Sequence, residues 1–414
     1  MNISKRKAAG AVAALAAVSL VAGVSLPAGA ATAPLKVGAI LPLTGGLSFL
    51  GDPMVAGFWA AVDEINNNGG VLGSKITVTG IKDEADGSNL AISTQSAKEQ
   101  IAAGAQVILG AASSGRTYNI IKDLTGAGIV QISPSNTDIG LSTYKDNGFY
   151  FRTAPSDLLQ GRVNGNNILA AGKKNVAIIY QQSSYGTGLM GTAKDALVKG
   201  GATVKTYAFA ENETNFTSTA NSVKAQNADA VLVISYDEFK KIAPALKDQG
   251  YKGNQIYMVD GNVGNYSKES FAAWLDGAQG TQAGADPSKA FATKLNAAFL
   301  SHSKKALPLT IYGAEAYDAI IVAALAATEA KSTKAADIKK HMVSVTTGGV
   351  KVHTFAEAVK AIKAGKNIDY DGQSGPIDFD ANGNPSTAYM GVYSYGTDGT
   401  NSLKKMVKAA VPAK

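Results

Sequence analysis

The chain of 414 residues contains no cysteine and only three histidines. The lack of cysteine excludes disulfides, thiolate metal sites, a cysteine nucleophile and a lipid-modified cysteine at a mature N-terminus. The histidines, His302, His341 and His353, do not have the spacing of metal ligands. A GxSxG nucleophile motif is also missing from the sequence. We therefore expect no catalytic residue, no metal, no cofactor and no enzymatic activity.

Long apolar runs are lacking except at the beginning of the chain. Three basic residues, Lys5 to Lys7, precede an apolar stretch from Ala8 to Leu26 that ends in the small residues Ala28 to Ala30. This order is typical of a secretory signal peptide, and the alanine-rich run broken by glycine does not favour a transmembrane anchor. No later stretch approaches the roughly twenty apolar residues that span a bilayer. We expect a signal peptide over residues 1–30 and an exported protein without a lipid anchor, periplasmic or extracellular at the cell surface.

Charge of one sign is only in small excess. The net charge is +7, and the three basic residues of the predicted signal peptide account for part of it, leaving +4. Lysines are scattered among acidic residues, and no basic run is interleaved with aromatic residues. Such a distribution is typical of a solvated surface. We expect no nucleic-acid partner.

The sequence does contain a regular alternation of short apolar runs and amphipathic segments from Leu35 onward. This alternation predicts parallel strands covered by helices. The first series has predicted strands at 35–43, 76–81, 107–109 and 129–132, with helices at 90–103 and 118–124. The second series has predicted strands at 176–180, 204–209, 230–235 and 256–259.

The alternation pauses around Pro155 and restarts, and helices dominate from Pro287 onward until late strands at 389–395. The length favours two domains. The fold class is therefore predicted as α/β, with two similar doubly wound lobes joined by three crossings. The crossings are expected near Thr153, Gln282 and Asp380. Lobe 1 would comprise residues 34–154 and 283–380, and lobe 2 residues 155–282 and 381–414.

Two motifs suggest other ligands, and neither is complete. Gly186, Gly188 and Gly191 form a GxGxxG, but five residues separate its first glycine from the predicted strand. A dinucleotide site needs these glycines in the tight turn itself, so we expect no nucleotide.

The second motif resembles a calcium loop. Asp378, Asp380, Asn382 and Gly383 copy its first half, but Tyr389 stands where the bidentate carboxylate is needed. The better interpretation is a β-turn at Asn382 and Gly383, without a metal.

Polar side chains gather instead at the carboxyl ends of the predicted strands, where open α/β sheets bind ligands. Individually they can be helix caps or loop packing, but together they favour a site for a zwitterion, with anion donors in one lobe and phenols and a carboxylate in the other. In the first lobe they are Ser113, Ser114, Ser135, Asn136 and Thr137, and Gly115 adds a backbone amide. In the second lobe they are Tyr185, Tyr236 and Asp260.

Several segments resemble the type I periplasmic solute-binding proteins of the leucine, isoleucine and valine binding kind. The resemblance extends over essentially the whole chain after residue 30. The segments that carry it are KVGAILPLTGGLSFLGDPMVAGFWAAVDEINNNGGVLG, VILGAASSG, ISPSNT, FRTAPSDLLQG, SSYGTG and YDGQSGPIDFDANGNP.

The resemblance implies a ligand-binding role for particular residues. The counterparts of the residues that hold the ligand carboxylate are Ser114, Ser135 and Thr137. The residues that close on the ligand from the second lobe correspond to Tyr185, Tyr236 and Asp260, the last in a position where glutamate is common. A further contact corresponds to Phe49 or Leu50, before the first helix.

The implied function is that of a solute-binding component of an ABC transporter. Such a protein closes around a small ligand, here an amino acid and above all a branched-chain one, and delivers it to a permease in the membrane. We expect it to act as a monomer. A receptor or sensor of the same fold, a binder of aromatic acids, amides or urea, and an enzyme built on a carboxylate constellation are the alternatives that remain open.

Overall fold

The computed structural model describes Met1 and residues 33–411 apart from 86–88, 212 and 285, so the predicted signal peptide lies outside the described residues. Within these described ranges, no helix has both the length and the apolar character needed to cross a membrane. Residues 33–411 form two α/β lobes, each built on its own sheet, and a third small sheet.

Lobe 1 is built on a five-stranded parallel sheet with the order β2-β1-β3-β4-β5. Its side chains alternate between two covered faces. Val37 and Ala39 pack with α1 and α9, whereas Ile40 packs with residues of α2 and α3. A sheet covered on both faces explains the nearly continuous apolar runs of these strands. The strands are β1 (Lys36–Leu41), β2 (Thr77–Asp83), β3 (Val107–Gly110), β4 (Val130–Ser133) and β5 (Tyr150–Arg152).

The helices of lobe 1 come from two separate parts of the chain. They are α1 (Gly51–Asn67), α2 (Leu90–Ala102), α3 (Ser114–Gly126), α8 (Lys289–Ser303), α9 (Gly313–Glu329), α10 (Ala335–His341) and α11 (Phe355–Lys363), with short 3₁₀ helices at Ser48–Leu50 and Ile139–Thr143. The small third sheet contains β11 (Val350–Val352), β12 (Ile368–Gly372) and β13 (Gly375–Pro376).

Lobe 2 is built on a seven-stranded sheet with the order β15-β14-β10-β9-β8-β6-β7. The strands β6 to β10 run parallel, and β14 and β15 add an antiparallel edge. Ile178 packs towards α5 and Ile179 towards α6 and α7, so both faces are again covered. The strands are β6 (Asn175–Gln181), β7 (Thr203–Phe209), β8 (Ala230–Ile234), β9 (Ile256–Met258), β10 (Gln279–Ala283), β14 (Thr387–Tyr395) and β15 (Asn401–Ala410).

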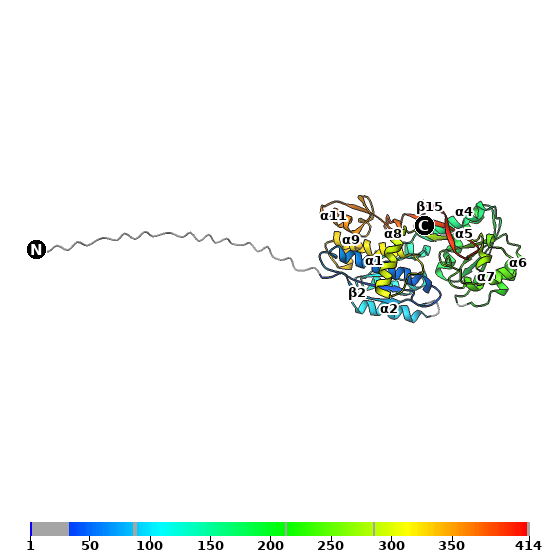
Figure 1. The fold of residues 1–414 in the computed structure, drawn as a ribbon, viewed down its shortest axis with the longest axis horizontal. Helices are drawn as coiled ribbons and strands as arrows, with labels where there is room; N and C mark the ends of the chain where they lie inside the picture. Colours follow the sequence, from blue (N-terminus) through cyan, green and yellow to red (C-terminus); the bar gives the residue numbers. More distant parts are fainter. Residues whose placement is uncertain (2–32, 86–88, 212, 285, 412–414) are drawn as a thin grey trace. The chain divides into compact units, whose positions relative to one another are not determined.

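The helices of lobe 2 lie between its parallel strands in sequence, except α4, which precedes β6. They are α4 (Asp157–Ala170), α5 (Ser184–Lys199), α6 (Thr217–Ala225) and α7 (Phe239–Asp248), with 3₁₀ helices at Gly253–Gln255 and Ala272–Leu275. Figure 1 shows these helices grouped around the lobe 2 sheet.

The chain passes between the lobes three times: between β5 and β6, after β10, and between β13 and β14. The predicted fold class of two similar α/β lobes joined by three crossings is therefore confirmed. The residue limits given for the lobes remain a prediction. The helix predicted at 90–103 agrees closely with α2, but the helix predicted at 118–124 begins four residues earlier, at Ser114.

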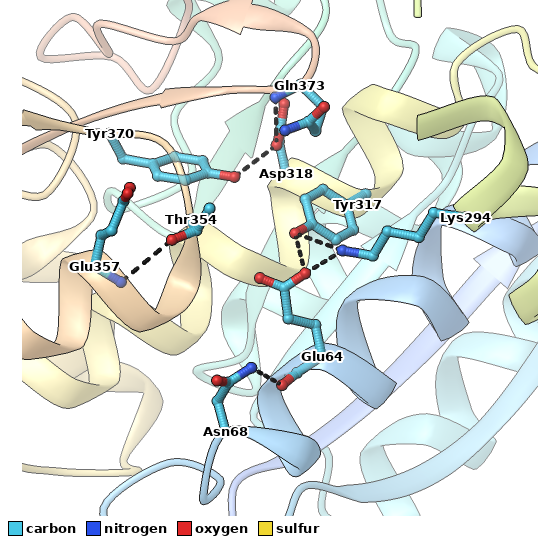
Figure 2. A network of polar contacts seen from close by, with 9 residues as sticks. All are labelled: Glu64, Asn68, Lys294, Tyr317, Asp318, Thr354, Glu357, Tyr370 and Gln373. Carbon is cyan, nitrogen blue, oxygen red and sulfur yellow. Dashed lines mark hydrogen bonds and ion pairs between the residues drawn. The ribbon is translucent and has the colours of Figure 1, made fainter. Parts of the chain in front are cut away.

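Helix α9 is buried along almost its whole length and connects several parts of lobe 1. The Tyr317 hydroxyl donates to Glu64 Oε2 on α1 at 2.7 Å, and Lys294 on α8 pairs with the same carboxylate. One residue further along, Asp318 accepts hydrogen bonds from the Tyr370 hydroxyl at 2.9 Å and the Gln373 amide at 3.0 Å (Figure 2). These bonds hold α1, α8 and the third sheet around α9.

The contact between α1 and α9 should be intolerant of added volume. A Cβ atom on Gly57 would lie 2.2 Å from the backbone carbonyl oxygen of Gly313, which cannot move without shifting the helix. We predict that Gly57→Ala lowers the free energy of unfolding by about 2 kcal/mol. Gly191→Ala, on α5 where a Cβ would meet open space, should be neutral or slightly stabilising. Denaturant unfolding measures both, and equal stability of the two variants would refute this packing argument.

Candidate functional site

The strand ends of the two lobes meet at a small cavity. It is lined by six of the seven residues predicted for the site, and by Tyr312, Leu47, Ala112 and Gly261. The six are Leu50, Ser114, Ser135, Tyr185, Tyr236 and Asp260. Thr137 is buried but is not part of this lining. Of the two candidates before the first helix, it is Leu50 and not Phe49 that reaches the cavity.

The lobes are in contact at this site. The cavity has a volume of about 20 Å³, little more than one water molecule needs. The Tyr312 hydroxyl, at the start of α9 in lobe 1, donates to Asp260 Oδ2 in lobe 2 at 2.5 Å. A solute of amino acid size can therefore enter only if the lobes separate and this hydrogen bond breaks.

The lobe 1 wall is suited to an anion. Helix α3 begins at Ser114, so its first backbone amides and the positive end of its dipole lie beside the cavity. The preceding turn is fixed by Glu84, whose carboxyl group accepts hydrogen bonds from the amides of Ala112 at 2.5 Å and Ser113 at 2.9 Å. Burial raises the pKa of Glu84 to about 8, against the effect of these hydrogen bonds. Glu84 thus positions the loop that carries Ser114.

The loop after β4 carries polar residues with two roles: some hold neighbouring loops together, and others line the cavity or lie near it. Asn136 accepts from the hydroxyls of Thr117 at 2.5 Å and Tyr150 at 2.8 Å, and donates to the Ala112 carbonyl at 2.7 Å, so it joins the loops. The Ser135 hydroxyl donates to the same carbonyl at 2.9 Å, while its side chain also lines the cavity. The Thr137 hydroxyl is buried and has no hydrogen-bond partner among the described residues.

The opposite wall is centred on a buried carboxylate. The Tyr185 hydroxyl donates to Asp260 Oδ1 at 2.7 Å, opposite the bond from Tyr312. Tyr236 stacks on Tyr185 with ring centroids 5.4 Å apart and thereby holds the Tyr185 ring in place. Burial raises the pKa of Asp260, although the hydrogen bonds from Tyr312 and Tyr185 lower it. The two phenols therefore occupy both oxygens of the only acid predicted for the site.

A second carboxylate, Asp157, lies close to Asp260 and was not predicted. It is 0% exposed at the start of α4, and neither of its oxygens has a hydrogen-bond partner among the described residues. Burial raises the pKa of Asp157 well above its ordinary range and the Asp260 charge raises it further, while the nearby Thr137 hydroxyl lowers it. Two buried carboxyl groups this close together can accept hydrogen bonds from a ligand that has several N–H donors and a positive charge.

Sequence reasoning missed Asp157 and Tyr312 for different reasons. Asp157 directly follows Ser156, which caps α4 with its hydroxyl accepting from the Leu158 amide at 3.4 Å, so its sequence position is that of an ordinary acid in a first helical turn. Tyr312 precedes α9 in a left-handed conformation with a φ of 60°. No pattern marks such a residue, because only the return of the chain to lobe 1 brings it to the site.

The glycine motif does not form a phosphate-binding turn. Gly186, Gly188 and Gly191 all lie inside α5, and a Cβ on Gly188 would be 3.0 Å from Asp138 Oδ1 of lobe 1. Of the three, only Gly188 allows α5 to approach the other lobe closely, whereas a dinucleotide fingerprint lies in the strand-to-helix turn.

A group of carboxylates elsewhere has the spacing of a metal site, formed by Asp369, Asp371 and Asp378. The Lys351 ammonium already pairs with Asp369 Oδ2 at 3.0 Å and with Asp371 Oδ1 at 2.8 Å. The β-turn predicted at Asn382 and Gly383 is present, since the Gly383 amide donates to the Asp380 carbonyl at 3.0 Å. Because Lys351 pairs with two of the three carboxylates, we assign this group a structural role beside the third sheet.

Comparisons with known proteins agree with this architecture. Residues 34–400 match the family described as periplasmic binding protein. The Leu/Ile/Val-binding protein BraC3 of Rhizobium johnstonii is 30% identical over 254 residues, which are 61% of this chain and 67% of that protein.

Two solved structures show the same fold. The leucine-binding protein LivK of Thermotoga maritima has a TM-score of 0.73 at 20% identity, over 90% of this chain and 98% of that one. The branched-chain amino acid transporter substrate-binding protein LivJ of Streptococcus pneumoniae, solved in complex with isoleucine, has a TM-score of 0.72 at 23% identity, over 91% and 100%.

The carboxylate pair should make the folded protein less stable as the pH rises. The raised pKa of Asp157 means that the folded state binds its proton more tightly than the unfolded state, in which the pKa is near 3.8. Stability contributed by this proton is present at low pH and is lost as the pH rises towards the raised value. We predict that Asp157→Asn raises the melting temperature at neutral pH and flattens its fall with pH.

Thermal unfolding between about pH 5 and about pH 8 measures this effect. The matched control is Asp195→Asn, an exposed acid on α5. A melting curve of Asp157→Asn that follows the parent at every pH would show that Asp157 is not strained by burial.

Proposed function

Because the chain belongs to the periplasmic binding protein family, we propose that it binds an α-amino acid between its two lobes and delivers it to the permease of an ABC transporter. The observation that carries the proposal is the polarity of the two walls of one cavity. The N-terminus of α3 lies on the lobe 1 side, and on the lobe 2 side Asp260 lines the cavity, with the buried Asp157 carboxyl group near it. An α-amino acid has the matching pair of charges.

The carboxylate of the solute would lie against the start of α3. The Ser114 hydroxyl and the first amides of the helix are donors there, and charge-assisted hydrogen bonds to an anion are stronger than neutral ones. Thr137 lies outside the cavity lining and beside Asp157, so its contact with the solute carboxylate stays a prediction from the resemblance.

The ammonium of the solute would lie between Asp157 and Asp260. An ammonium has three N–H donors, and Asp157 has two oxygens without partners among the described residues. At Asp260, an N–H of the solute would replace the Tyr312 hydroxyl. The cation also removes the repulsion between the two carboxylates, so binding compensates for the cost of burying them.

Closure of the lobes follows from the same contacts. The solute carboxylate is held by lobe 1, and its ammonium is held by Asp260 of lobe 2, so binding both ends favours the arrangement in which the lobes meet. Phenols from both lobes, Tyr185 and Tyr312, would then surround the charged pair and exclude water. The closed form is the state that a permease can distinguish from the open one.

The names of the related proteins point to the kind of amino acid. BraC3 is a Leu/Ile/Val-binding protein, and the LivJ structure contains isoleucine. We accordingly propose leucine, isoleucine and valine as solutes of this protein. We also propose that it is exported by its signal peptide, acts as a monomer at the cell surface or in the periplasm, and has no catalytic activity.

The proposal predicts unequal effects of substitutions on leucine binding. Asp260→Ala should weaken binding by at least about 2 kcal/mol, about thirtyfold, because the ammonium would be buried without its main partner. Asp157→Asn should weaken it in the same direction. Ser114→Ala should cost less, since several donors share the carboxylate. Titration calorimetry measures all three, with Asp195→Asn as the control.

A solute without an ammonium shows whether Asp260→Ala removes one contact to the ammonium or disturbs the whole site. The parent should bind 4-methylpentanoate, which is leucine without its amino group, much more weakly than leucine, and Asp260→Ala should cause little additional loss for this analogue. If Asp260→Ala binds leucine as tightly as the parent, the ammonium is held elsewhere and the amino acid proposal fails.

A further inference from the structure

The apolar part of the site indicates where the side chain of an amino acid solute would lie. Ser114 and the start of α3 face the solute carboxylate, and Asp260 with its two phenol partners faces the ammonium. The apolar lining groups that take no part in these contacts belong to Leu47, Leu50 and Ala112 of lobe 1 and to the ring of Tyr236 of lobe 2. An aliphatic side chain would pack against these four residues, because burial of apolar surface is favourable there.

Two of these four residues separate the site from a larger cavity. The volume of the larger cavity is about 400 Å³, against about 20 Å³ for the site itself. Among the described residues, Leu47 and Tyr236 are the two that line both cavities. Leu47 lies in the loop before α1 of lobe 1, and Tyr236 lies after β8 of lobe 2. The two side chains therefore form a partition only while the lobes are in contact.

Both halves of the partition are held in place. The Tyr236 ring stacks on Tyr185, and the Tyr236 backbone amide donates to Glu238 Oε2 at 2.9 Å. Leu47 is 6% exposed and belongs to the apolar core around α1, and its carbonyl accepts from the Leu50 amide at 3.0 Å. Because the Leu47 side chain has no polar group, it can limit the space for a solute only through its volume.

We infer that Leu47 sets the upper limit on the size of the solute side chain. With the lobes in contact, a side chain of branched-chain size ends at Leu47 and Tyr236. An aromatic side chain is longer, meets the partition and keeps the two lobes apart. Specificity then comes from exclusion of larger amino acids as well as from contacts with smaller ones. The inference rests on the proposed function, because the charged groups of the solute are held on the near side of the partition.

Truncation of Leu47 should open the site to aromatic amino acids. The parent should bind phenylalanine at least about tenfold more weakly than leucine, since even one methylene group changes affinity for an apolar pocket by about tenfold or more. Leu47→Ala should reduce this preference by at least about tenfold, because the phenyl ring can then extend into the larger cavity. Leu47→Val should give an intermediate change. Titration calorimetry of leucine and phenylalanine on each variant measures the ratio of the two affinities.

Two controls separate the volume of Leu47 from other effects. Leu43→Ala makes the same change at a leucine of the same loop that is 42% exposed and lines neither cavity, and it should leave the affinity ratio unchanged. Leu47→Met nearly conserves the side-chain volume and should also preserve the ratio. Circular dichroism melting of every variant shows that it is folded. The milder truncation Leu47→Val carries the test if Leu47→Ala does not fold.

The outcomes distinguish this inference from the proposed function. A parent that binds phenylalanine as tightly as leucine or more tightly would overturn the size limit and leave the amino acid function intact. The same holds if Leu47→Val and Leu47→Ala keep the affinity ratio of the parent. A parent that binds neither amino acid would overturn both proposals. A ratio that shifts towards phenylalanine in the order parent, Leu47→Val, Leu47→Ala would establish Leu47 as the residue that limits the size of the solute.

Discussion

Asp260 receives hydrogen bonds from a phenol of each lobe, Tyr185 and Tyr312, and lies near the equally buried Asp157. A buried carboxylate is unfavourable unless it is paired, and here the available partners are neutral phenols. This unfavourable arrangement gives a cationic group its advantage at the site. It also connects binding to lobe contact, because the Tyr312 hydrogen bond joins lobe 1 to lobe 2.

The topology explains why these groups meet. Parallel strands in each lobe bring the ends of β3 and β4 to one edge and those of β6, β8 and β9 to another, and the three crossings hold the two edges near one another. The lobe 1 side is positive because it is the N-terminus of α3. The lobe 2 side is acidic because it carries the carboxyl pair. Binding a zwitterion across the two walls requires both lobes, which is the physical basis of a closing cleft.

Much of the fold could be predicted from the sequence, since two-sided parallel sheets leave nearly continuous apolar strands between amphipathic helices. Two of the strands that were missed, β10 and β15, lack this signal. β10 reads QGTQA, and β15 is an edge strand rich in exposed lysine. Such strands are specified by pairing with β14 and not by their own composition.

The residues of the site also fall into those that the sequence predicts and those that it does not. Residues directly after predicted strands, such as Ser114 and Asp260, were found because the topology fixes their position. Asp157 and Tyr312 were not, because Asp157 matters through its burial next to Asp260 and Tyr312 through a contact that only the assembled lobes create. A carboxylate at a helix start has the same sequence pattern whether it caps the helix or faces a second carboxylate.

The number of protons released on binding tests the central claim most directly. Titration of leucine at about pH 6, in buffers of different ionisation enthalpy, counts these protons. Because an ammonium between Asp157 and Asp260 lowers the raised pKa of both, the account predicts that leucine binding releases protons and that Asp157→Asn releases fewer. Binding of leucine with no proton release between about pH 5 and about pH 7, or with proton uptake, would contradict it.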